Sequence, residues 1–239
     1  MKKLLALLAT AAALQAANPV VTGNLSLNAK DWSLSTQNIK GKWPYSNTIT
    51  GSLQMPFPVS VDDPSGQFVG YWTMLLGHSI NIQPGGLLQL VVKITTTGAP
   101  VFGYHSETGN TCVVPASARF YISQGTGNDL ERWWSNQVAL TLQNTATPVI
   151  PYSQSSGVFN NTDGTVTMIV LFDPALWSSV YGEFANQDAN TLAKFQQSLQ
   201  NVGNIGVTFG GGCFFGHGAN VIQGTGTATI ELRQFRVGN

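Results

Sequence analysis

The chain has 239 residues, of which only 9% are charged, and its eleven basic and eleven acidic residues give a formal net charge of zero. So low a content of charged residues argues against a nucleic-acid partner, because binding to the phosphate backbone needs a large basic patch. Solubility must rest on Ser, Thr, Asn, Gln and Gly. That composition is common in exported β-proteins, and its surface suits neutral ligands such as glycans.

The first residues predict a secretory signal peptide. Two lysines precede an apolar run over residues 4–14, which is too short to span a bilayer, and small residues follow at Ala16. We therefore expect a leader over residues 1–16 and one domain over 17–239. No later apolar segment reaches the roughly 18 residues of a membrane span, so we expect a secreted or periplasmic protein.

Turn signals recur along the chain, and the segments between them are typical of strands. The last of these changes phase at Gln234, which predicts a β-bulge. The region 143–164 is rich in turn residues and is predicted to be a surface loop. The expected strands cover residues 47–55, 68–76, 87–94, 118–122, 165–172 and 227–237.

One segment has helical periodicity instead. Its apolar residues are Leu192, Phe195, Leu199 and Val202. This spacing predicts a short α-helix near 189–201, with Asp188 or Asn190 as its N-cap. Because strands dominate and no β-α alternation is visible, we predict an all-β fold, an antiparallel β-sandwich of jelly-roll type.

The stretch 206–218, GVTFGGGCFFGHG, holds six glycines. It lacks the lysine of a phosphate-binding loop, and the next expected element is a strand, not a helix. A metal site would have to combine Cys213 and His217 with distant residues, in a spacing that matches no common zinc pattern. We expect a structural strand in which Ile205, Val207 and Phe209 point inward, with no cofactor. A structural calcium ion at the Asp62–Asp63 turn is the alternative to a solvated turn.

The two cysteines, Cys112 and Cys213, lie 101 residues apart. In an oxidising compartment, an even pair of cysteines predicts one disulfide. The competing interpretation is two buried free thiols.

Two regions are candidates for ligand binding. Trp133 and Trp134 are adjacent, so a strand would send their rings to opposite faces, and an exposed ring could stack on a sugar while Glu131 binds hydroxyls. Both rings could instead be core. The second region is the loop 101–112, whose candidate ligand-binding residues are Tyr104, His105 and Glu107.

The C-terminal half carries a resemblance to known domains. The segments FDPALWSSVYGEF, FQQSLQNVGNIGVTFGGGCFFGHG and GTATIELRQFRV, within residues 165–237, resemble jelly-roll domains similar to galactose-binding and carbohydrate-binding modules. The chain also resembles a group of uncharacterised secreted bacterial proteins that share the FGGGCFF pattern. These motifs are architectural, and they imply a fold and carbohydrate binding without assigning a binding residue.

These observations lead us to expect a secreted, non-catalytic protein that binds a neutral polysaccharide or cell-surface glycan. No catalytic residues are assigned, because paired-glutamate and nucleophile-elbow signatures are absent from the sequence. Two alternatives remain open. One is a hydrolase or lyase on the same scaffold using Glu107, Asp129 or Glu131, and the other is a structural or surface-assembly protein.

Overall fold

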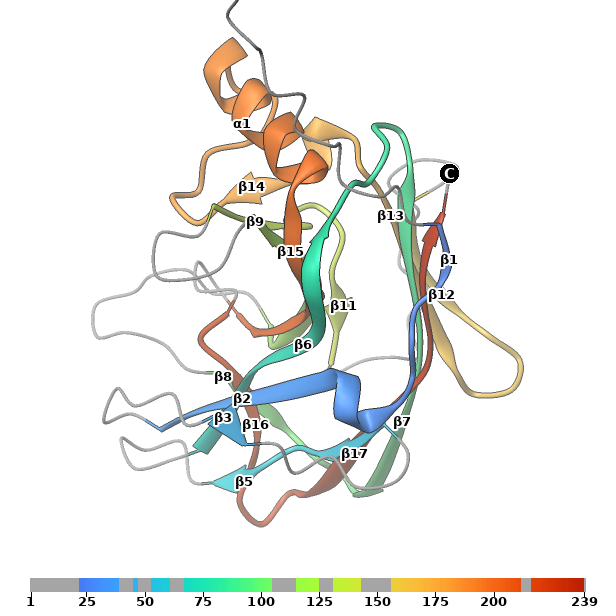
Figure 1. The fold of residues 1–239 in the computed structure, drawn as a ribbon. Helices are drawn as coiled ribbons and strands as arrows, with labels where there is room; N and C mark the ends of the chain where they lie inside the picture. Colours follow the sequence, from blue (N-terminus) through green and yellow to red (C-terminus); the bar gives the residue numbers. More distant parts are fainter. Residues whose placement is uncertain are drawn as a thin grey trace, which may run out of the picture.

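The computed structural model describes residues 22–38, 45–46, 53–60, 67–104, 115–124, 131–142, 156–211 and 216–238. Within them the chain forms two β-sheets that face each other, with one α-helix at one end (Figure 1). This confirms the predicted all-β sandwich. Every strand pair in the described residues is antiparallel except that of β16 with β5.

The small sheet has six described strands. They are β1 (Gly23–Asn24), β4 (Gln54–Pro56), β7 (Leu87–Gly98), β12 (Gly157–Asn160), β13 (Val166–Leu171) and β17 (Gly226–Gly238). The large sheet has eleven. They are β2 (Trp32–Asn38), β3 (Tyr45–Ser46), β5 (Val59–Ser60), β6 (Gln67–Ile80), β8 (Phe102–Tyr104), β9 (Ser117–Gln124), β10 (Arg132–Trp134), β11 (Leu140–Thr141), β14 (Ser178–Ser179), β15 (Val202–Gly210) and β16 (Ala219–Ile222). The helices are α1 (Ala189–Gln200) and the 3-10 turns η1 (Ala29–Asp31) and η2 (Pro174–Leu176).

The strand order is that of a jelly roll. In the small sheet β17 lies between β4 and β7, and β13 follows β7. The large sheet has the central order β6, β15, β9, β10. The chain crosses repeatedly from one sheet to the other, for example between β6 and β7, between β7 and β8, between β11 and β12, between β13 and β14, and between β16 and β17. These crossings close the two facing sheets of a jelly roll around one core.

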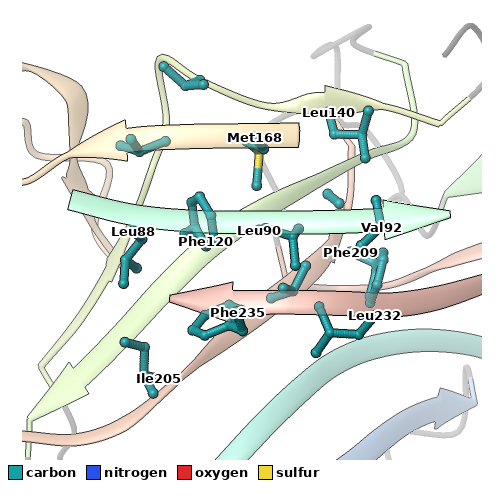
Figure 2. Close-up of a cluster of buried hydrophobic side chains, with 14 of the residues drawn as sticks. Leu88, Leu90, Val92, Phe120, Leu140, Met168, Ile205, Phe209, Leu232 and Phe235 are labelled. Carbon is teal, nitrogen blue, oxygen red and sulfur yellow. The ribbon is translucent and has the colours of Figure 1, made fainter. Parts of the chain in front are cut away.

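The core lies between the two sheets, where alternate residues of each strand meet (Figure 2). The small sheet contributes Leu90 and Phe235, and the large sheet contributes Phe120 and Phe209, all fully buried. The rings of Phe120 and Phe235 meet edge to face, with centroids 5.7 Å apart. Such contacts join the sheets through the apolar face of each strand.

The predicted bulge in β17 is present. Leu232 pairs with Val92 and Gln234 with Val91, so Arg233 is the extra residue. The insertion resets the alternation, and Leu232 and Phe235 both point into the core.

Helix α1 begins after Asp188, whose carboxylate accepts a hydrogen bond from the Thr191 backbone N–H at 2.8 Å. This confirms the predicted cap. The buried stripe differs in part from the prediction, because its members are Thr191, Phe195, Ser198 and Leu199. Leu192 is only half-buried, and Val202 is the first residue of β15 instead of a helical residue.

Other expectations are corrected or lie outside the described residues. The predicted loop 143–164 contains β12 and the start of the β12–β13 hairpin, because Val158 and Met168 pair across two strands. In the glycine-rich stretch, Ile205, Val207 and Phe209 are buried as expected. Both cysteines and the Asp62–Asp63 turn lie outside the described residues, so the disulfide stays a prediction.

Candidate ligand-binding site

The two adjacent tryptophans do point to opposite faces of β10. Trp133 pairs with Ile122 of β9 and faces the core, where it is 0% exposed. Its indole packs edge to face on Phe195 of α1, with ring centroids 5.1 Å apart. The indole N–H donates to Ser198 Oγ at 3.0 Å. Trp133 is therefore an anchor for the helix.

The expectation that one of the two rings is exposed is wrong, because Trp134 is only 5% exposed. It lies on the outer face of the large sheet, between Tyr121 of β9 and Ser178 of β14. Strand β14 covers the edge that β10 would otherwise present to solvent. Neither tryptophan therefore offers a free indole face for a sugar.

The outer face of the large sheet is polar but enclosed. Thr73, Gly206 and Tyr121 are consecutive partners across β6, β15 and β9, so the side chains of Thr73 and Tyr121 share that face on either side of the glycine. The Tyr121 hydroxyl spans the glycine and hydrogen-bonds the Thr73 hydroxyl. All three positions are buried. This row therefore stabilises the sheet rather than forming an open binding surface.

Arg119 lies one row further along the same face and is also buried. Its guanidinium donates to the Ser117 hydroxyl. Desolvation by burial lowers the pKa of Arg119 to about 10, so the side chain stays charged at neutral pH.

Two of the predicted site residues that the structure describes, Glu131 and Tyr104, lie at opposite ends of the large sheet's central strands. Glu131 lies at one end of β9, where its carbonyl accepts from the Gln124 N–H at 2.9 Å. Tyr104 is half-buried on β8, which pairs with β16. These two strands lie beyond the Gly210 end of β15, whereas Glu131 lies near its Val202 end. His105 and Glu107 lie outside the described residues.

A different aromatic residue is accessible. Tyr181 is 79% exposed, the highest value among the exposed large hydrophobic side chains that the structure describes. It lies in the segment 179–183, which we call the Tyr181 turn. The neighbouring Val180 is also exposed.

The Tyr181 turn is fixed by backbone hydrogen bonds. The Gly182 N–H donates to the Ser179 carbonyl at 3.0 Å, and the Ser179 N–H donates to the Glu183 carbonyl at 2.8 Å. This is the pattern of a three-residue hairpin loop with a glycine bulge. The φ of Gly182 is 79°, a conformation that glycine adopts without steric cost.

The Ser179 side chain adds two further constraints. Its hydroxyl accepts from the backbone N–H of Tyr181 at 3.2 Å and of Glu183 at 3.3 Å. Serine at the first turn position and glycine at the fourth is a common β-turn pattern. The letters SVYG at 179–182 therefore carry a signal for a rigid turn with an aromatic tip, although they were interpreted above only as part of an architectural motif.

The start of β10 lies beside this turn. The Val180 N–H donates to the Arg132 carbonyl at 3.1 Å, and Trp133 pairs with Ser179. Glu131, one of the predicted ligand residues, directly precedes Arg132, and Glu183 closes the turn. All three charged residues are half-buried. Backbone contacts thus place one basic and two acidic residues in or next to the Tyr181 turn.

Comparison with protein-family models, with curated proteins and with solved structures finds no match for this chain. The resemblance to carbohydrate-binding modules therefore has no independent support. In the described part of the chain, no helix has the length and apolar character needed to cross a bilayer.

Proposed function

We propose that this chain is exported and binds a neutral polysaccharide or cell-surface glycan without catalysis. The observation that carries the proposal is the exposed ring of Tyr181 on a turn fixed by hydrogen bonds. The expected leader lies outside the described residues, so export is part of the proposal.

A phenol ring suits a sugar for a physical reason. The axial C–H groups of a pyranose form a weakly polar face that packs on an aromatic ring, while the hydroxyls stay at the edge. Tyrosine presents a large, rigid surface with few rotatable bonds, and so loses little conformational entropy on binding. A turn already fixed by Ser179 lowers the ordering cost further.

The polar neighbours supply the second half of such a site. Glu131 and Glu183 offer carboxylate acceptors and Arg132 offers guanidinium donors, which are the groups that hydrogen-bond sugar hydroxyls. The backbone contact between Val180 and Arg132 holds these residues beside the turn. Tyr104, His105 and Glu107 remain a separate candidate contact on the 101–112 loop.

One observation favours the hydrolase alternative. Glu183 closes the turn and Glu131 precedes Arg132, which contacts it, and glycoside hydrolases need two carboxyl groups on either side of the scissile bond. A reducing-end assay on any retained polysaccharide separates binding from hydrolysis. Release of reducing ends, abolished by Glu131→Gln or Glu183→Gln, would replace the binding proposal by the hydrolase alternative.

Affinity electrophoresis on a panel of neutral polysaccharides tests the binding proposal. We expect at least one polysaccharide to retard the protein, Tyr181→Ala to abolish the retardation, and Tyr181→Phe to keep most of it. Val59→Ala is the matched control, because Val59 is also an exposed apolar residue but lies on β5 at the far edge of the large sheet.

The contrary outcomes are equally specific. If no polysaccharide retards the protein, or if Tyr181→Ala and Val59→Ala are retarded like the parent chain, the Tyr181 turn is not a glycan site. Concentration-dependent self-association without retardation would instead support the structural or surface-assembly alternative.

A further inference from the structure

Most carboxylates in the described residues have a structural partner. Glu231 forms an ion pair with Arg233 at 2.8 Å. The four described aspartates each accept a hydrogen bond from a hydroxyl or a backbone N–H close in sequence: Asp31, Asp163, Asp173 and Asp188. The described carboxylates that remain are Glu131 and Glu183, and no described residue donates to either.

These two glutamates lie next to the same feature. Glu183 closes the Tyr181 turn, because its carbonyl accepts from the Ser179 N–H. Glu131 is one residue from Arg132, whose carbonyl accepts from Val180. Two glutamates whose carboxylates stabilise no local structure thus lie in or next to the Tyr181 turn, and so does Arg132. Together these three side chains carry about one net negative charge.

We propose that Glu131 and Glu183 are specificity residues that make the Tyr181 site select neutral glycans and reject acidic ones. This inference rests on the proposed function of the same site. A uronate or sulfate bound at the turn would be repelled by both carboxylates, because like charges on neighbouring surface groups repel one another even in water. Arg132 opposes the effect, so its removal should strengthen the rejection.

A chemically matched pair of ligands tests the inference whichever sugar the site binds. The neutral polysaccharide that retards the protein most is used before and after oxidation of its primary hydroxyls to carboxylates. We expect oxidation to weaken retention at low salt by roughly three-fold for each glutamate involved, and added salt to restore part of it.

The variants assign the effect to residues. Glu131→Gln and Glu183→Gln keep side-chain size and a hydrogen-bond acceptor, and each should lower the ratio of neutral to oxidised polymer retained by about three-fold relative to the parent chain. Arg132→Gln should widen the difference between the two polymers. Glu231→Gln is the control, since Glu231 is a glutamate on the small sheet already paired with Arg233.

Each outcome decides between the two claims. If the neutral polymer is not retained by the parent chain, the proposed function fails. If both polymers are retained equally, or if neither Gln variant changes their ratio, the specificity claim fails while glycan binding stands. If Glu231→Gln changes the ratio as much as the other two, the effect is one of overall charge and the claim is also wrong.

Discussion

The indole N–H of Trp133 donates to the hydroxyl of Ser198 at 3.0 Å, which ties β10 to helix α1 across the core. The same hydroxyl lies 2.9 Å from the Lys194 carbonyl, one turn earlier in the helix. Phe195 packs on the indole from the same helix face. This hydrogen bond at the contact between helix and sheet therefore fixes the rotation of α1 about its own axis. Apolar contacts alone would define that rotation less sharply.

The first prediction follows from this bond. Ser198→Ala should lower the free energy of unfolding by about 1–3 kcal/mol, because it leaves the buried indole N–H without its acceptor. Denaturant unfolding measures the change. Gln197→Ala, on the exposed side of the same helix, is the control and should change stability by less than about 0.5 kcal/mol. Equal stabilities of the Ser198→Ala variant and the parent would show that the bond contributes nothing.

The second prediction separates two leucines of α1. Leu199 is buried and its carbonyl accepts from the Ile82 N–H at 2.8 Å, whereas Leu192 is half-buried. Leu199→Ala should cost about 2–5 kcal/mol, because it leaves a cavity, and Leu192→Ala should cost less. Melting curves of both variants give the comparison. A larger loss for Leu192→Ala would mean that the helix is rotated from the position described above.

The third prediction concerns acid. Hydrogen bonds from the Thr191 backbone N–H and hydroxyl hold the pKa of Asp188 below its ordinary value of 3.8. The unfolded chain therefore binds a proton more readily than the folded chain, so this stabilisation is present above pH 3.8 and is lost as pH falls through the folded pKa. Asp188→Asn keeps a capping oxygen but cannot titrate.

The Asp188→Asn variant should accordingly lose less stability than the parent chain when the pH is lowered below about 4. The free energy of unfolding of each protein, measured at neutral pH and again in acid, gives the loss for each. Asp173→Asn is the control, because Asp173 caps η2 in a similar way but lies outside α1. Parallel acid losses in Asp188→Asn and the parent would exclude the cap as a source of acid sensitivity.

Local patterns predicted much of this fold. Alternation in β13 and β17, the bulge at Gln234 and the cap at Asp188 all depend on residues close in sequence, and each was predicted correctly. The adjacent residues Trp133 and Trp134 show what local patterns cannot predict. Period-two geometry placed the rings on opposite faces, but the burial of Trp133 depends on α1, which begins more than fifty residues later.

The Tyr181 turn was not predicted as a candidate site, for a related reason. Tyr181 lies in a turn too short to show any periodicity, and its exposure depends on where β14 pairs with β10. The serine and glycine are a local signal for a turn. That this turn holds an aromatic ring away from the core could not be predicted from them. Glu131 was selected as a candidate ligand residue beside a tryptophan, whereas the exposed ring near it is that of Tyr181.

The last prediction tests whether the rigidity of the Tyr181 turn matters for binding. Gly182 has a φ of 79° and open space where a Cβ would lie, so Gly182→Ala introduces backbone strain without a steric clash. A left-handed conformation costs a non-glycine residue about 1–2 kcal/mol, which should favour other conformations of the turn. The Tyr181 ring itself is unchanged.

Gly164, at the tip of the β12–β13 hairpin, is a close match as a control. Its φ is 77°, and it too has open space at the Cβ position. Gly164→Ala should therefore lower the melting temperature about as much as Gly182→Ala, but only Gly182→Ala should weaken polysaccharide retention. If both variants retain the polysaccharide like the parent, a preorganised turn is not needed and the exposed ring alone accounts for binding. If Gly164→Ala weakens retention equally, the loss reflects general destabilisation, and the Tyr181 turn has no special part in recognition.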